Sequence, residues 1–161
     1  MRYNNQLDVL KRIMVRERLT PKTHLHGVGA MHPGNIMLVG ERASGSQYGK
    51  LTNDHPFCTL KACSGWLNSL LEAAEIPEER LYWINILDTD GAPISLAPYL
   101  EDYRPSHIVC LGGIALNHVK RQLGDLKTPV LHQMHPQYWK RFRSSEPYPL
   151  IQLLKGLTNN E

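Results

Sequence analysis

The sequence predicts an α/β protein with a mostly parallel sheet. Short apolar runs that suit buried strands alternate with stretches whose apolar residues recur every three or four positions, as they do in helices. The first such run, residues 36–39, ends abruptly at Gly40 and a charged pair, as a buried parallel strand does where it enters a loop. Ligands of open α/β sheets bind outside such strand ends, so we expect a functional site there.

Composition excludes several classes of protein. The 161 residues fit one domain over 1–161, and 42% of them are apolar, as in globular proteins. No apolar run approaches the roughly 20 residues of a membrane span, and the charged N-terminal segment lacks the apolar centre of a secretory signal. The formal charge of +3 permits nucleic-acid binding without requiring it.

Cysteines and histidines indicate neither a disulfide framework nor a metal centre. The three cysteines include no Cys-x-x-Cys pair, which favours a reducing, intracellular setting. The eight histidines are scattered, and none forms His-x3-His with a neighbouring acid. A Walker phosphate loop is also absent from the sequence, because Gly45 is followed by Ser46 and Lys50 by Leu51. We therefore expect no metal and no cofactor.

Local periodicity predicts the elements in order. Residues 4–19 carry Leu10, Ile13 and Met14 at helical spacing, so we expect an amphipathic helix with one buried stripe. Turn formers predict a loop over 21–33, and the polar, aperiodic residues 41–57 predict a second, long loop. Strands are expected over 36–40, 81–87, 107–111 and 129–131, and helices over 60–74, 95–103, 114–123 and 150–157. The helix over 114–123 has one apolar side, formed by Ile114, Leu116, Val119 and Leu123.

Polar side chains stand at the carboxyl ends of three of these strands. Glu41 and Arg42 follow the first strand, Asn85 lies near the end of the second, and His135 follows the last. A doubly wound sheet would bring such ends together in one crevice. Each residue also has an ordinary explanation, since Asn85 could satisfy turn backbone and His135 could cap a loop.

Five segments in order carry further information. They are Leu38-Val39-Gly40-Glu41, then Pro56-Phe57 with residues 64–71, then Tyr82-Trp83-Ile84-Asn85-Ile86, then residues 107–112 with Ala115, and finally His135-Pro136-Gln137-Tyr138. Together they resemble the motifs of the uracil-DNA glycosylase superfamily, especially its bacterial and archaeal iron–sulfur branch. The resemblance covers about residues 35–143. It implies a three-layer α/β/α sandwich around a four-stranded, mostly parallel sheet, and an enzyme that flips uracil or a related pyrimidine from DNA and hydrolyses its N-glycosidic bond.

The resemblance also implies roles for matching residues. Phe57 would stack on the flipped base, Asn85 would read its edge, and His135 would stabilise the charge that develops on the base oxygen. Gly40 and Arg42 would adjoin the base. Pro136, Gln137 and Tyr138 would form the loop that enters the duplex, and Lys140 and Arg141 would contact phosphates.

The first motif departs from the family pattern. Arg42 and Ala43 stand where the family normally has, or soon reaches, an acidic residue that positions the attacking water. Asp54, Gln47 and Glu41 are candidates for that role, in this order. Asp88 stands where the branch has a cluster ligand, so we expect no iron–sulfur centre.

Two other functions remain open from the sequence. One is a non-hydrolytic member that binds DNA or a modified base, and the other is an enzyme that acts on an unusual base or a free nucleotide, with Arg42 holding a phosphate. In each case we expect a monomer in the cytoplasm that has no contact with a membrane. DNA is the expected partner of the glycosylase and of the non-hydrolytic member.

Overall fold

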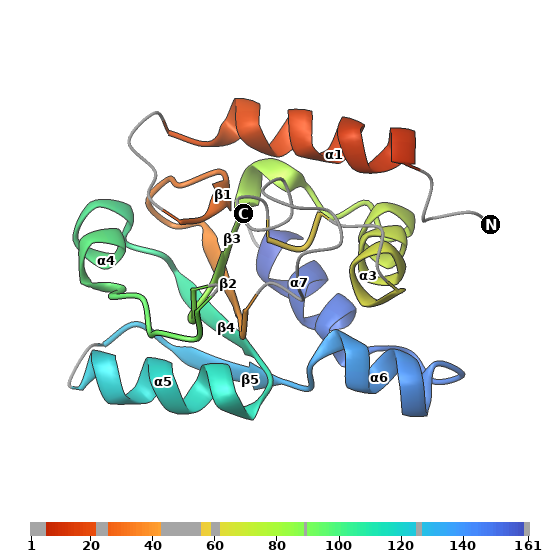
Figure 1. The fold of residues 1–161 in the computed structure, drawn as a ribbon. Coiled ribbons are helices and arrows are strands. Elements are labelled where there is room, and N and C mark those ends of the chain that lie inside the picture. The colour runs from red at the N-terminus through yellow and green to blue at the C-terminus, as the bar shows by residue number, and fades with distance from the viewer. Residues whose placement is uncertain are drawn as a thin grey trace.

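A five-stranded mixed sheet organises the chain (Figure 1). The structure, a computed structural model, describes residues 6–21, 26–42, 56–58, 62–88, 90–124 and 127–159. The strands are β1 (Val28–Gly29), β2 (Ile36–Gly40), β3 (Leu81–Asn85), β4 (His107–Leu111) and β5 (Val130–Gln133), in the spatial order β1-β3-β2-β4-β5. The pairs β3/β2, β2/β4 and β4/β5 are parallel, whereas β1 pairs antiparallel with β3. The α/β class agrees with the expectation, but the sheet has five strands instead of four, because β1 joins it at one edge.

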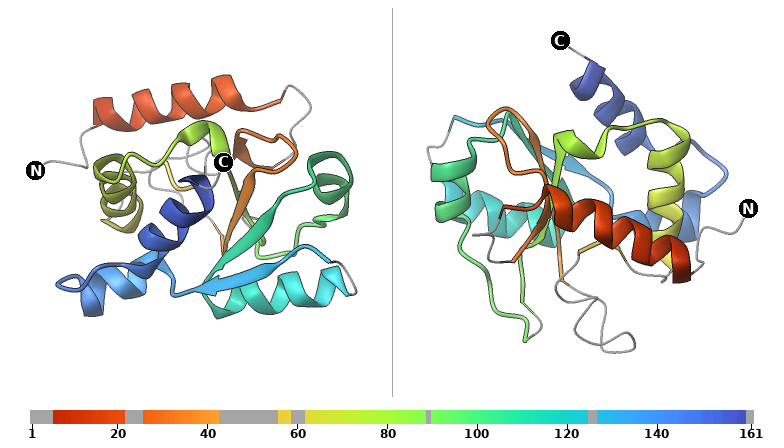
Figure 2. Two further views of the ribbon diagram at one scale, coloured as in Figure 1. Left: turned by 180° about the vertical axis from the view of Figure 1, so that it is seen from behind. Right: turned by 90° about the horizontal axis from the view of Figure 1, so that it is seen from above.

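Helices cover both faces of the sheet (Figures 1 and 2). Helices α1 (Gln6–Leu19), α3 (Ala62–Ala73) and α7 (Pro149–Asn159) share one apolar cluster with the side chains of alternate strand residues. Helices α4 (Ala97–Tyr103) and α5 (Gly113–Leu123) share a second cluster with the side chains on the other face. Helix α6 (Pro136–Arg143) packs against α3, and the 3₁₀ helix η2 (Glu78–Arg80) precedes β3.

The chain reverses direction across the sheet at β2. From β2 it passes through α3 to β3 on one side, and from β3 it passes through α4 to β4 on the other side of β2. In doubly wound sheets the crevice outside the strand ends forms at such a reversal. The fold therefore places the carboxyl ends of β2, β3 and β4 next to one another at the position expected for a site.

The predicted buried stripe of α1 is wrong in two positions. Ile13 is buried, but Leu10 and Met14 are exposed, Met14 with 68% of its surface. Arg16 instead lies entirely inside the protein. The helix turns the face that carries Ile13 and Arg16 toward the sheet, because partners are present there for the Arg16 charge.

The apolar side of α5 is also shifted from the expectation. Ala115 and Val119 are buried against the sheet, whereas Ile114, which we expected on the buried side, is exposed. The helix begins at Gly113, one residue earlier than expected.

The loop that the resemblance implied at residues 135–138 is the start of a helix. Strand β5 continues to Gln133, and α6 begins directly afterwards, with His135 as its N-cap. Pro136 occupies the first helical position, where its missing N–H costs nothing. Helix formers follow in Gln137, Lys140 and Arg141.

The other corrections are smaller. The expected loop 21–33 contains β1, and β3 ends at Asn85, two residues before the predicted end. The strand expected over 129–131 runs from Val130 to Gln133. Within the described parts of the chain, none of the helices has the length and apolar character to cross a bilayer.

Candidate functional site

Asn85 and Phe57 both approach Gly40 closely at the end of β2. Gly40 and Asn85 are direct neighbours in the parallel register of β2 and β3. A Cβ atom at Gly40 would lie 2.5 Å from Asn85 Oδ1 and 2.6 Å from Cε2 and Cζ of the Phe57 ring. Only glycine leaves room for both side chains here, so this close approach explains the glycine at the end of the strand.

Phe57 is held in a conformation that bulky residues avoid. Its φ angle is +60°, and only 8% of its surface is exposed. The left-handed region costs an L residue about 1–2 kcal/mol. The Phe57 carbonyl accepts hydrogen bonds from Arg16 Nη1 at 3.0 Å and from Asn68 Nδ2 at 2.6 Å, and these bonds offset the cost. Strain maintained by surrounding groups is typical of functional sites.

The Phe57 ring lies near two other aromatic rings, those of Trp83 and His135. Its centroid lies 5.4 Å from that of Trp83 and 6.4 Å from that of His135. The structure therefore brings together Gly40, Phe57, Asn85 and His135, which come from four separate parts of the sequence.

Arg16 lies beneath Phe57 and Trp83 and supports both residues. It was not predicted from the sequence. Its guanidinium makes two bonds to the Glu78 carboxylate, at 3.0 and 3.1 Å, and lies over the Trp83 ring, 4.3 Å from the centroid. It also donates to Asn68 Oδ1 at 2.6 Å and to Cys58 Sγ at 3.3 Å. The spacing of Arg16 from Ile13, one helical turn, was the available signal, but it does not distinguish a buried arginine from a solvated one.

His135 is positioned as a hydrogen-bond donor. Its Nδ1 accepts a hydrogen bond of 3.1 Å from the backbone N–H of Gln137. An N–H group only donates, so Nδ1 carries a lone pair and the neutral ring holds its proton on Nε2. Burial lowers the pKa of His135 below its ordinary value, and the negative charge of Glu41 only partly opposes this effect. The imidazole is therefore neutral near pH 7, with Nε2–H as a donor.

The backbone around His135 is fixed on both sides. The Tyr148 hydroxyl donates to the carbonyl of Met134, and the N–H of Gly112 donates to the carbonyl of Gln133 at 2.9 Å. Gly112 has a φ of +104°, and a Cβ on it would lie 3.4 Å from the Cβ of His135. The end of β4 thus packs directly against the histidine.

The other predicted residues are partly accounted for. Glu41 follows β2, and its carbonyl accepts a hydrogen bond of 2.8 Å from Leu87 N–H. The negative charge of its carboxylate opposes the lowering of the His135 pKa. Arg42 is exposed and extends along the turn after β3, where its Nη1 would lie 3.3 Å from a Cβ on Gly91. Asp54 and Gln47 lie outside the described residues.

Two polar groups of the site are free to bind a ligand. Within the described residues, neither the side-chain amide of Asn85 nor Nε2 of His135 has a hydrogen-bond partner. An amide offers both donors and an acceptor, and Nε2–H offers a donor. With the Phe57 ring beside them, these groups suit a flat, polar heterocycle on which negative charge develops. In the same described parts of the chain, no three His, Cys, Asp or Glu side chains gather as metal ligands would.

The residues expected to contact DNA lie together on α6. Pro136 is buried at the start of the helix, Gln137, Tyr138 and Arg141 are exposed, and Lys140 is half-buried. Three of the eight residues of α6 are basic and none is acidic. These residues thus lie on a helix that follows the catalytic candidate His135, and not on a loop.

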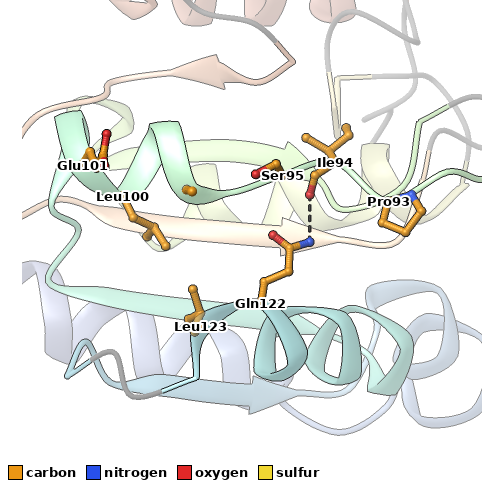
Figure 3. A pocket seen from close by; sticks show the side chains of 8 residues that line it. Pro93, Ile94, Ser95, Leu100, Glu101, Gln122 and Leu123 are labelled. Atoms are coloured by element: carbon orange, nitrogen blue, oxygen red, sulfur yellow. Dashed lines mark hydrogen bonds between the residues drawn. The ribbon is translucent and has the colours of Figure 1, made fainter.

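A groove of about 620 Å³ lies away from these residues, between α4 and α5 (Figure 3). Its wall includes Leu100, Glu101 and Leu123, and none of the site residues lines it. The Gln122 amide at its centre is already used, because it donates to the Ile94 carbonyl and accepts from Leu96 N–H, each at 2.8 Å. We therefore place the candidate site at the strand ends, where free polar groups converge, and not in this groove.

No protein-family model matches this chain, and no curated protein matches it. The functional assignment therefore depends on the geometry of the site and on the resemblance of the motifs.

Proposed function

We propose that this protein is a glycosylase of the uracil-DNA glycosylase type, which takes uracil or a related pyrimidine out of DNA and hydrolyses its N-glycosidic bond. The main support is the contact of Gly40 with both Phe57 and Asn85, beside His135. The four parallel strands between two helical layers are compatible with the superfamily fold that the motifs imply. β1 would be an addition at the edge of that fold.

Base recognition would use Phe57 and Asn85. A flipped base would lie against the Phe57 ring, which packs on Trp83. The Asn85 amide would donate to one carbonyl oxygen of a pyrimidine and accept from the neighbouring ring N–H. Cytosine has the opposite donor and acceptor pattern on that edge, so this geometry would select uracil or thymine over cytosine if the amide is fixed.

Bond cleavage would depend on His135. When the bond between C1′ of the sugar and N1 of the base breaks, its electron pair moves to the base and charge accumulates on the O2 oxygen. The neutral His135 ring would donate Nε2–H to that oxygen. A preorganised donor of this kind contributes about 10²–10³ to the rate. Water would add to C1′ and lose a proton to solvent, the departing base anion would take up a proton, and the products would be the free base and an abasic site.

The residue that positions the water is the open part of the proposal. Glu41 is the candidate among the described residues, because it directly follows β2 and its negative charge opposes the lowering of the His135 pKa. Asp54 and Gln47 remain candidates from the sequence alone. Lys140 and Arg141 on α6 would bind the phosphates on either side of the flipped nucleotide.

A panel of labelled oligonucleotides tests the proposal. Single and double strands would contain uracil, a thymine mismatch, hydroxymethyluracil or hypoxanthine, and alkali would reveal abasic sites as strand breaks. We expect breaks that depend on one pyrimidine. Absence of breaks with every base, at enzyme in excess over DNA, would contradict the glycosylase proposal.

One observation favours a second candidate, a protein that binds a base or DNA without cleaving it. Arg42 is exposed at the edge of the site, and in the described residues no carboxylate pairs with it. A cation in place of the acidic first motif suits binding of a phosphate better than activation of water. Tight binding across the panel without strand breaks would favour this candidate, and Arg42→Gln should then weaken binding.

A further inference from the structure

Helix α6 has one face that is firmly anchored. The Trp139 ring stacks on Tyr148 with centroids 5.6 Å apart, and Tyr148 stacks in turn on Trp66 of α3 at 5.5 Å. Trp139 Nε1 also donates to the carbonyl of Glu146 at 3.1 Å. The orientation of α6 is therefore fixed by Trp139, and the side of the helix next to Trp139 faces solvent.

That outward face carries two large aromatic side chains. Tyr138 and Phe142 are separated by one helical turn, their ring centroids lie 5.0 Å apart, and 42% and 63% of their surfaces are exposed. Arg141 lies between them in sequence, with its guanidinium carbon 5.5 Å from the centre of the Phe142 ring. Adjacent exposed aromatic residues on a rigid helix mark a binding surface, since burial in the core does not account for them.

We propose that the face formed by Tyr138, Arg141 and Phe142 stacks on unpaired bases, so that this protein acts on single-stranded nucleic acid in preference to duplex. The inference rests on the proposed function, because it takes the strand that would deliver its base to His135. It names the form of the substrate and adds Phe142 to the residues that bind it.

The position of the face fits a strand that passes through the candidate site. Helix α6 begins at His135, and Phe142 is seven residues further on, about 10 Å along the axis at about 1.5 Å per residue. Successive nucleotides of a stacked strand are roughly 3.4 Å apart, so the face would take the two or three nucleotides next to the flipped one. The basic residues Lys140 and Arg141 supply the charge that the strand's phosphates require.

The shape of the face favours unpaired bases over a duplex. A wedge that enters a duplex is a single apolar side chain pushed between two stacked base pairs. Tyr138 and Phe142 instead form a pair of rings tilted by 48° to each other, which is broader than the gap between two base pairs. Unpaired bases expose their flat surfaces, and aromatic side chains beside basic ones bind them without reading sequence.

Fluorescence anisotropy with thymine-only oligonucleotides, single-stranded and paired with their complement, tests this inference. Removing one base–aromatic stack weakens binding about 5- to 150-fold, so we expect losses in this range for Phe142→Ala with the single strand and little change with the duplex. Phe142→Trp should retain binding. Ile114→Ala, which truncates an exposed apolar residue on α5, is the matched control and should bind as wild type does.

Either of two binding results would overturn the inference. One is unchanged single-strand binding by both Phe142→Ala and Tyr138→Ala, and the other is an equal loss for duplex and single strand. A shift in sedimentation of Phe142→Ala without any change in binding would show instead that the face contacts a second copy of the chain. Because thymine oligonucleotides measure binding alone, a stacking face without glycosylase activity would contradict only the proposed function, and base excision unaffected by Phe142→Ala would contradict only this inference.

Discussion

The guanidinium of Arg16 donates a hydrogen bond of 3.0 Å to the backbone carbonyl of Phe57, 41 residues further along the chain. Through this bond a helix at the start of the described chain holds the aromatic residue of the candidate site in its left-handed conformation. Arg16 is fully buried, and its charge is balanced by Glu78. The position of Phe57 thus depends on an ion pair beneath the site.

Arg16→Met should strongly destabilise the fold. It leaves the Glu78 carboxylate, which is only 28% exposed, without its cation and removes a donor from the Phe57 carbonyl. Breaking one side of a buried ion pair costs about 3–5 kcal/mol. Urea unfolding would measure the loss, with Arg18→Met on the exposed side of the same helix as the control. Similar stabilities of the two variants would contradict the structural role of Arg16.

Gly40→Ala should damage the site more than the fold. The new Cβ would meet the Asn85 amide and the Phe57 ring, so one of the two must move away from the strand end. We expect base excision and base binding to fall at least tenfold. Gly113→Ala is the control, because nothing lies within 4 Å of its Cβ position and alanine suits the first turn of a helix. Wild-type activity in Gly40→Ala would show that the three residues do not act together.

The stability of the protein should fall on acidification, in part because of His135. Burial lowers the pKa of His135 in the folded protein, so below about pH 6.5 the unfolded chain binds a proton that the folded protein does not. The contribution is present above that pH and is lost as the pH falls toward the folded-state pKa, by at most about 1.4 kcal/mol for each unit of pKa depression.

His135→Asn isolates this effect. Asparagine retains an acceptor for the Gln137 N–H and is a favourable N-cap, but it does not titrate. The free energy of unfolding would be measured at pH 7.5 and pH 5.5 for both proteins. The variant should lose less stability between the two pH values than wild type, and an equal loss would mean that the folded protein does not depress the pKa of His135.

Gly156→Ala should stabilise the protein. Gly156 lies inside α7, nothing is within 4 Å of its Cβ position, and alanine is favoured over glycine in a helix by about 0.8–1.0 kcal/mol. Thermal unfolding would show the gain. Gly124→Ala provides the contrast, since Gly124 has a φ of +51° and alanine there should destabilise the protein. A lower melting temperature for Gly156→Ala would place this part of α7 outside the helix.

Much of the fold could be predicted from periodicity. Strands β2 and β4 and the helices α3, α4, α5 and α7 lie close to their expected ranges, because buried parallel strands and amphipathic helices leave distinct apolar patterns. Strand β1 could not be predicted in this way, since its two residues, Val28 and Gly29, are too few to show a period.

The error at α6 has a different cause. Pro136 at the first helical position and the helix formers after it indicate a helix, but the resemblance of His135-Pro136-Gln137-Tyr138 to a family loop outweighed that local evidence. Local propensity was the better guide to backbone conformation, whereas the resemblance predicted which residues lie near Phe57.

For the site, the resemblance implied Gly40, Phe57, Asn85 and His135, and these four residues lie close together in the structure. The sequence did not predict Arg16, because its partners Glu78 and Asn68 are more than 50 residues away and only the folded chain shows that the arginine is buried. It also did not predict Phe142, whose exposure depends on Trp139 being the anchor of α6.

The most direct test of the proposed site is the single-turnover rate of base excision by His135→Ala, measured beside its affinity for an abasic oligonucleotide. His132→Ala, an exposed histidine on β5, is the matched control and should behave as wild type does. If Nε2–H of His135 stabilises the departing base, His135→Ala should lose about 10²–10³ in rate and keep most of its affinity for abasic DNA. A wild-type rate, or an equal loss of rate and affinity, would contradict this account.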